Sequence, residues 1–125
     1  MFFKSKNLYI EWSEVTIPWL KIFTIEPYRE ITDCPSYAID ELWRTVLICE
    51  KTLREYYKPD KINIASFGNQ LPRVHIHIMA RFADDSHFPE SMWGERQREG
   101  DLILPDRAVF ETRLIAALNA ANVCS

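Results

Sequence analysis

The segment from residue 73 to residue 82 constrains the fold most, because its polar and apolar side chains alternate almost without a break. Successive side chains of a β-strand point to opposite faces of the sheet. One face of such a strand would carry Val74, Ile76, Ile78, Ala80 and Phe82, which is a core face. The other face would carry Arg73, His75, His77, Met79 and Arg81. The pattern therefore predicts a strand whose sheet is packed on one side and presents polar groups on the other.

The apolar spacing around this segment predicts two hairpins separated by a long helix. Runs rich in aromatic and branched residues indicate strands, whereas apolar residues at three- and four-residue spacing indicate helices. The predicted elements are strands at 8–15 and 19–25, a helix at 37–57, strands at 62–67 and 73–82, and a helix at about 105–122. This order favours an α+β fold in a single domain spanning residues 1–125, with an antiparallel sheet of about five strands, one long central helix and a C-terminal helix.

Composition excludes several classes of protein. The 125 residues carry a net charge of −3, which gives no general attraction to a nucleic-acid polymer or to an anionic membrane. Only three glycines occur, too few and too scattered for a glycine-rich phosphate loop. Cysteines without a CxxC pair predict reduced thiols at Cys34, Cys49 and Cys124. Because we find neither a signal peptide nor a membrane-length apolar run, we expect a cytoplasmic protein.

The polar face of the 73–82 strand allows three interpretations. The first is that it simply meets solvent. The second is that His75 and His77 form half of a zinc or iron site, with a third ligand from Asp84, Asp85 or His87. Two arginines on the same face disfavour a cation and favour the third interpretation, an anion site. In such a site arginine binds phosphate, and a neutral imidazole attacks phosphorus as a nucleophile.

The stretch from Asn63 to Arg81 resembles the signature hairpin of the histidine triad family, whose motif is His-φ-His-φ-His-φ-φ with φ apolar, often followed by Pro-Arg. His75 matches the middle histidine and His77 the third, while Arg73 stands where the first histidine is expected. Every intervening apolar position is kept. The order of hairpin, helix and motif hairpin also resembles the family, and the Trp93-Gly94 pair is similar to a bacterial branch of it. The likeness covers roughly residues 8–95.

The resemblance implies a nucleotide hydrolase or transferase that needs no cofactor and no metal. In this scheme His75 attacks the α-phosphate of a nucleoside monophosphate ester, anhydride or phosphoramidate, which gives a nucleotidyl-histidine that water hydrolyses. His77 would orient the site. Phosphate and ribose contacts would come from Gly68, Asn69, Gln70, Asn63 and Arg81. The resemblance also implies a homodimer, with a nucleotide as its small-molecule partner.

Arg73 is the main departure from the motif, and two hypotheses follow from it. A guanidinium stays charged near neutral pH, so Arg73 cannot act as a proton donor or acceptor. It either holds phosphate and stabilises charge in the transition state, or the chain has lost catalysis and only binds nucleotides.

Overall fold

The structure is a computed structural model and describes residues 1–123; Cys124, one of the predicted reduced thiols, lies outside the described residues. Its elements in chain order are β1 (Phe3–Lys4), β2 (Leu8–Trp12), β3 (Trp19–Thr24), a 3₁₀ turn (Ile31–Asp33), α1 (Ser36–Tyr57), β4 (Lys61–Ala65), β5 (His75–Arg81) and α2 (Arg107–Ala120). All strand pairs are antiparallel, in the order β1-β2-β3-β5-β4. The predicted α+β fold with five strands and two helices is confirmed.

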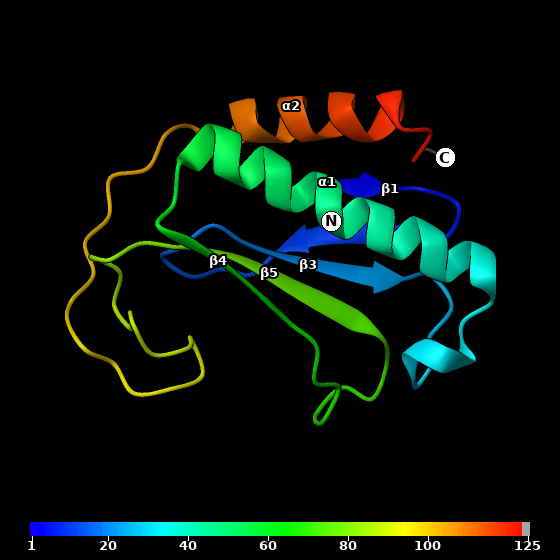
Figure 1. The fold of residues 1–125 in the computed structure, drawn as a ribbon, viewed down its shortest axis with the longest axis horizontal. Helices are drawn as coiled ribbons and strands as arrows, with labels where there is room; N and C mark the ends of the chain where they lie inside the picture. Colours follow the sequence, from blue (N-terminus) through cyan, green and yellow to red (C-terminus); the bar gives the residue numbers. More distant parts are fainter. Residues whose placement is uncertain (124–125) are drawn as a thin grey trace.

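Both helices pack on the same face of the sheet (Figure 1). The core between the layers contains the predicted apolar face of β5, and Phe82 packs against its edge. The helix α2 lies beside α1, where Phe110, Leu114 and Leu118 are fully buried. Among the described residues, neither helix is long and apolar enough to cross a membrane. The helices thus leave the opposite face of the sheet for other uses.

Local chemistry sets the helix bounds close to the prediction. The helix α1 ends at Tyr57. The next residue, Lys58, has a left-handed backbone (φ 51°) and donates its N–H to the carbonyl of Arg54, and Pro59 cannot continue the helix. At the start of α2, the side chain of Asp106 accepts a hydrogen bond from the N–H of Ala108, which satisfies one of the free donors of the first turn.

The strands differ from the prediction at several bounds. The strand predicted at 8–15 ends at Trp12, and the one predicted at 62–67 spans Lys61–Ala65. The short β1 was not predicted, because two residues give no periodic signal. The strand predicted from residue 73 begins at His75, because residues 73 and 74 bond outside the ladder. The N–H of Arg73 donates to Leu71, and that of Val74 donates to the carbonyl of Tyr28 in a distant loop.

A buried ion pair fixes the long segment between β5 and α2, which contains no helix or strand from residue 82 to residue 106. The Nε of Arg81 lies 2.9 Å from Oδ2 of Asp85, and both side chains are at most 1% exposed. The same carboxylate accepts hydrogen bonds from the backbone N–H groups of Phe82, His87 and Phe88. Arg81 also donates to Asn63 and to the carbonyl of Glu90. One carboxylate and one guanidinium therefore hold the start of this segment against the sheet.

We predict that Asp85→Asn lowers the free energy of unfolding by about 3 kcal/mol at pH 7, because it leaves Arg81 charged and buried without its partner. Burial raises the pKa of Asp85, but the bonds from Arg81 and the three N–H groups outweigh it and lower that pKa from 3.8 to about 2. The stabilisation is therefore complete above pH 3.8 and is lost as the pH falls towards 2.

Urea unfolding of both proteins from pH 7 down to pH 2 measures this difference. The neighbouring Asp84→Asn is the matched control, because Asp84 is exposed. A difference between wild type and Asp85→Asn that stays constant across this pH range would contradict the assigned role of the ion pair.

Candidate functional site

Two rows of side chains cross the sheet on the face that the helices leave uncovered. In the first row, Tyr9, Phe23 and His75 are register partners on β2, β3 and β5. Their rings stack, with centroids 4.9 Å apart for Tyr9 and Phe23 and 5.0 Å apart for Phe23 and His75. In the second row, Glu11, Lys21 and His77 are partners in the same way. Strand pairing therefore places both histidines of β5 beside residues of β3.

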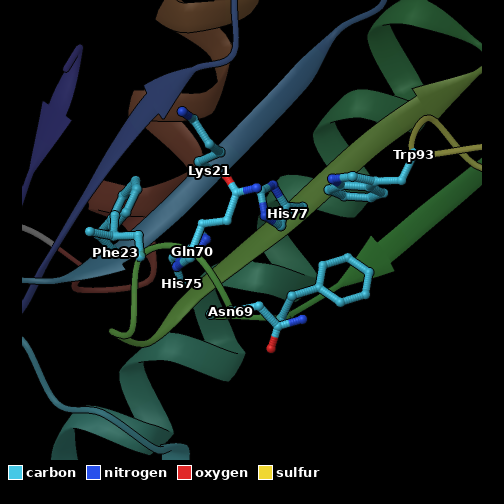
Figure 2. A pocket seen from close by; sticks show the side chains of 10 residues that line it. Lys21, Phe23, Asn69, Gln70, His75, His77 and Trp93 are labelled. Atoms are coloured by element: carbon cyan, nitrogen blue, oxygen red, sulfur yellow. The ribbon is translucent and has the colours of Figure 1, made fainter.

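A cavity of about 580 Å³ opens over these rows, and its walls come from β3, β5, the β4–β5 loop and the segment after β5 (Figure 2). Its lining residues are Lys21, Phe23, Phe67, Gly68, Asn69, Gln70, Leu71, His75, His77 and Trp93. The cavity combines two imidazoles, one ammonium and two side-chain amides with aromatic walls. A site of this size with few polar groups among apolar walls is typical of small-molecule binding.

The ring of His75 is held in one orientation by its own strand. Its Nδ1 lies 2.8 Å from the carbonyl oxygen of Arg73. A carbonyl only accepts hydrogen bonds, so Nδ1 carries the proton and donates it. In the neutral ring Nε2 then keeps its lone pair. The stack on Phe23 and the cavity beside the ring leave this nitrogen as the group available for chemistry.

His77 has the opposite tautomer. The indole Nε1 of Trp19 lies 3.0 Å from its Nδ1, and an indole N–H only donates, so Nδ1 of His77 is the acceptor. Burial, the neighbouring His75 and the charge of Lys21 lower the pKa of His77 from 6.5 to about 4. At neutral pH, His77 is therefore an uncharged ring whose proton is on Nε2.

The predicted turn residues Gly68, Asn69 and Gln70 do line the cavity, together with both histidines. Gly68 has a φ of +72°, a left-handed backbone that favours glycine, and this conformation shapes the turn. The turn therefore brings two amide side chains to the cavity that the histidines line.

Arg73, Asn63 and Arg81 lie outside the cavity lining. The guanidinium of Arg73 donates to the carbonyls of Thr24 and Ile25 and packs over the ring of Phe23. Arg81 is buried by the contacts described above, which include Asn63. Both guanidinium groups therefore contact oxygens of the protein itself and do not line the cavity.

The site also contains Lys21 and Phe23 in its lining and Trp19 against His77, none of which was predicted from the sequence. All three lie at alternate positions of β3, so the period-two rule places them on one face. Their association with the histidines follows from the β3–β5 register, which no local pattern gives. Phe67, Leu71 and Trp93 of the cavity wall lie in loops and were also missed as members of one site, although Trp93 was part of the family resemblance.

The structure does not assemble the metal site that was one interpretation of the histidine pair. Among residues 1–123, no group of three histidine, cysteine, aspartate or glutamate side chains is placed to hold a metal ion. Of the proposed third ligands, Asp85 is engaged by Arg81, and His87 pairs with the hydroxyl of Ser86 at 2.7 Å.

Known proteins resemble this chain in structure. No family model matches the sequence, and no curated protein matches it. A histidine triad protein from Bradyrhizobium japonicum is 25% identical with a TM-score of 0.73, over 94% of this chain and 87% of that one. One from Marinobacter aquaeolei is 20% identical with a TM-score of 0.72, over 98% and 89%. A zinc-bound histidine triad family protein from Mycobacterium smegmatis is 18% identical with a TM-score of 0.61, over 97% and 84%.

We predict that Trp19→Phe raises the pKa of His77 from about 4 by about one pH unit. The variant removes the N–H that favours an unprotonated Nδ1 but keeps an aromatic ring in place. NMR titration of the imidazole signals measures the change. Trp93→Phe is the matched control, because Trp93 meets His77 only through an edge contact at 5.0 Å. Equal pKa values in wild type and Trp19→Phe would show that the indole bond does not set the tautomer.

Proposed function

We propose that this chain, which has the histidine triad fold, binds a nucleotide in the β3–β5 cavity and transfers its nucleoside monophosphate group first to His75 and then to water. The observation that carries the proposal is the bond from Nδ1 of His75 to the Arg73 carbonyl, which leaves a lone pair on Nε2 at the cavity. The fold supports nucleotide binding or hydrolysis in general. The residue roles below are part of the proposal.

The chemistry proceeds in two displacements. Nε2 of His75 attacks the α-phosphorus, a P–N bond forms, and the bond to the leaving group breaks with its electron pair. Water then attacks the same phosphorus and releases a proton to solvent, the P–N bond breaks, and its electron pair returns to Nε2. The products are the leaving group and a nucleoside monophosphate. Such a covalent intermediate divides one difficult displacement into two easier ones.

Other cavity residues have roles that follow from their chemistry. The uncharged His77 keeps positive charge away from the attacking ring and offers its Nε2–H as a donor. The amides of Asn69 and Gln70 lie on the rim (Figure 2) and are suited to phosphate oxygens or ribose hydroxyls. Phe67 and Trp93, with centroids 4.8 Å apart, form an aromatic wall that suits a nucleobase.

Arg73 is a positioning residue in this scheme. Its guanidinium anchors to Thr24 and packs on Phe23, and its carbonyl orients His75. The alternative function, nucleotide binding without turnover, is favoured by the arginine at the first motif position. Binding of a nucleotide by the wild-type protein without a covalent adduct would establish that alternative.

Mass spectrometry of the intact protein after incubation with an adenylate ester tests the proposal. We expect a mass increase equal to one adenylyl group in the wild type and none in His75→Ala, whose turnover falls by more than about a thousandfold. His87→Ala is the control, because His87 does not line the cavity. An adduct that persists in His75→Ala contradicts the proposal. Stoichiometric zinc that is lost in His75→Ala contradicts it as well.

We predict that Arg73→Ala slows adduct formation about tenfold, because a loosened His75 attacks less often in the correct orientation. The affinity for AMP should stay unchanged, since the guanidinium does not line the cavity. Arg29→Ala is the control, because Arg29 is exposed and lines the same neighbouring groove as Arg73. Weaker AMP binding at an unchanged rate of adduct formation would show instead that Arg73 contacts phosphate. Unchanged rate and affinity would remove Arg73 from the mechanism.

The homodimer implied by the resemblance and the cytoplasmic location expected from the sequence stay predictions. Size-exclusion chromatography with light scattering tests the first, and cell fractionation tests the second.

A further inference from the structure

Lys21 is the one charged residue that lines the cavity in the part of the chain the structure describes. A terminal nitrogen of Arg73 donates to main-chain carbonyls, Arg81 is bound by the carboxylate of Asp85, and His77 is uncharged at neutral pH. The two arginines predicted on the polar face of β5 therefore do not line the cavity, whereas Lys21 of the neighbouring strand β3 does. A compact ammonium on a flexible stem suits a phosphate group as a point charge.

Lys21 lies beside the cavity, and its side chain is only partly buried. Its Nζ lies 3.4 Å from Oε1 of Glu11, and the lysine side chain is 26% exposed. The same Nζ is 6.0 Å from the ring centroid of Phe23, on which His75 stacks. A partly exposed pair of this kind is weak, so an incoming anion can take over the ammonium at little cost.

The leaving group is the part of a nucleotide that this arrangement suits. Arg73, at the first motif position, cannot transfer a proton. His77 is uncharged at neutral pH and lacks the second ring proton that an imidazolium could transfer. A leaving group that departs as a stable anion needs no proton, whereas an amine does. A positive charge at the cavity stabilises the anion as it forms.

We propose that Lys21 binds the phosphate next to the one that His75 attacks, so that the site selects nucleoside di- and polyphosphates over nucleotides with a neutral leaving group. This inference rests on the proposed function for the position of the α-phosphate. It adds a residue outside the histidine motif and a substrate preference.

Binding of two adenine nucleotides tests the proposal directly. The probes are AMP and α,β-methylene-ADP, which adds a second phosphate and is not cleaved between its phosphates. Isothermal titration gives the ratio of their dissociation constants. In the wild type we expect the methylene diphosphate to bind roughly tenfold more tightly than AMP, as one charge-assisted contact allows. Lys21→Met should bring the ratio close to one.

Three further variants separate this role from a structural one. Lys21→Arg keeps the charge and should keep the preference. Lys4→Met is the matched control, because Lys4 is an exposed lysine of the edge strand β1, away from the β3–β5 cavity. This variant should bind as the wild type does. Glu11→Gln frees the ammonium and removes a negative charge, so it should strengthen diphosphate binding a few-fold. That gain should disappear when Lys21→Met is also present.

The outcomes distinguish this inference from the proposed function. A ratio that is the same in wild type and Lys21→Met, or no binding of the methylene diphosphate by the wild type, overturns the role of Lys21. A ratio that collapses in Lys21→Met in a protein that forms no adduct at His75 supports Lys21 and rejects the catalytic proposal. An adduct at His75 together with a ratio that Lys21→Met leaves unchanged supports the catalytic proposal and rejects the role of Lys21.

Discussion

The structure depends on a strand that is buried on both faces for two different reasons. Every residue of β5 is buried. Its apolar side packs under the helices, and its polar side lies against β3 neighbours and the segment that follows β5. Since side chains of a strand alternate strictly, a shift of one residue would exchange the two sets. The core therefore fixes the register, and the register fixes where both histidines point.

The polar side of this strand illustrates how burial decides what a charged group does. Arg81 at the end of β5 and Arg73 just before the strand were both predicted on the side that faces the cavity, yet oxygens of the protein bind both guanidinium groups, although Nε of Arg73 is buried without a partner. An arginine that is buried needs such partners, because an unpaired charge in the interior is costly. Lys21 is more exposed than Arg81 and keeps only a weak partner, so its charge stays available. Net charge and residue type alone do not reveal this division.

Much of the fold follows from the sequence, and much of the site does not. Alternation in residues 74–82 predicted the core face of β5, and helical spacing before Pro59 predicted α1 to within one residue at either end. The pairing of His77 with Trp19 and Lys21 depends on the β3–β5 register, a long-range property. The bond from Arg81 to Asp85 depends on how the loop after β5 turns back, which has no periodic signal. Sequence patterns thus identified the histidines and their face, but only tertiary structure identified the groups that act on them.

The walls of the cavity come from two kinds of structure, the packed sheet and an exposed loop. The β3 and β5 side chains belong to the packed sheet, whereas residues 67–71 form an exposed loop that contributes nothing to the buried core. Apart from Gly68, whose left-handed backbone favours glycine, substitutions in that loop cost the fold little free energy, since surface changes outside a core are usually close to neutral. In evolutionary terms, the histidine wall can stay constant while the loop drifts. A lineage can therefore acquire new small-molecule partners without first accumulating a reserve of stability.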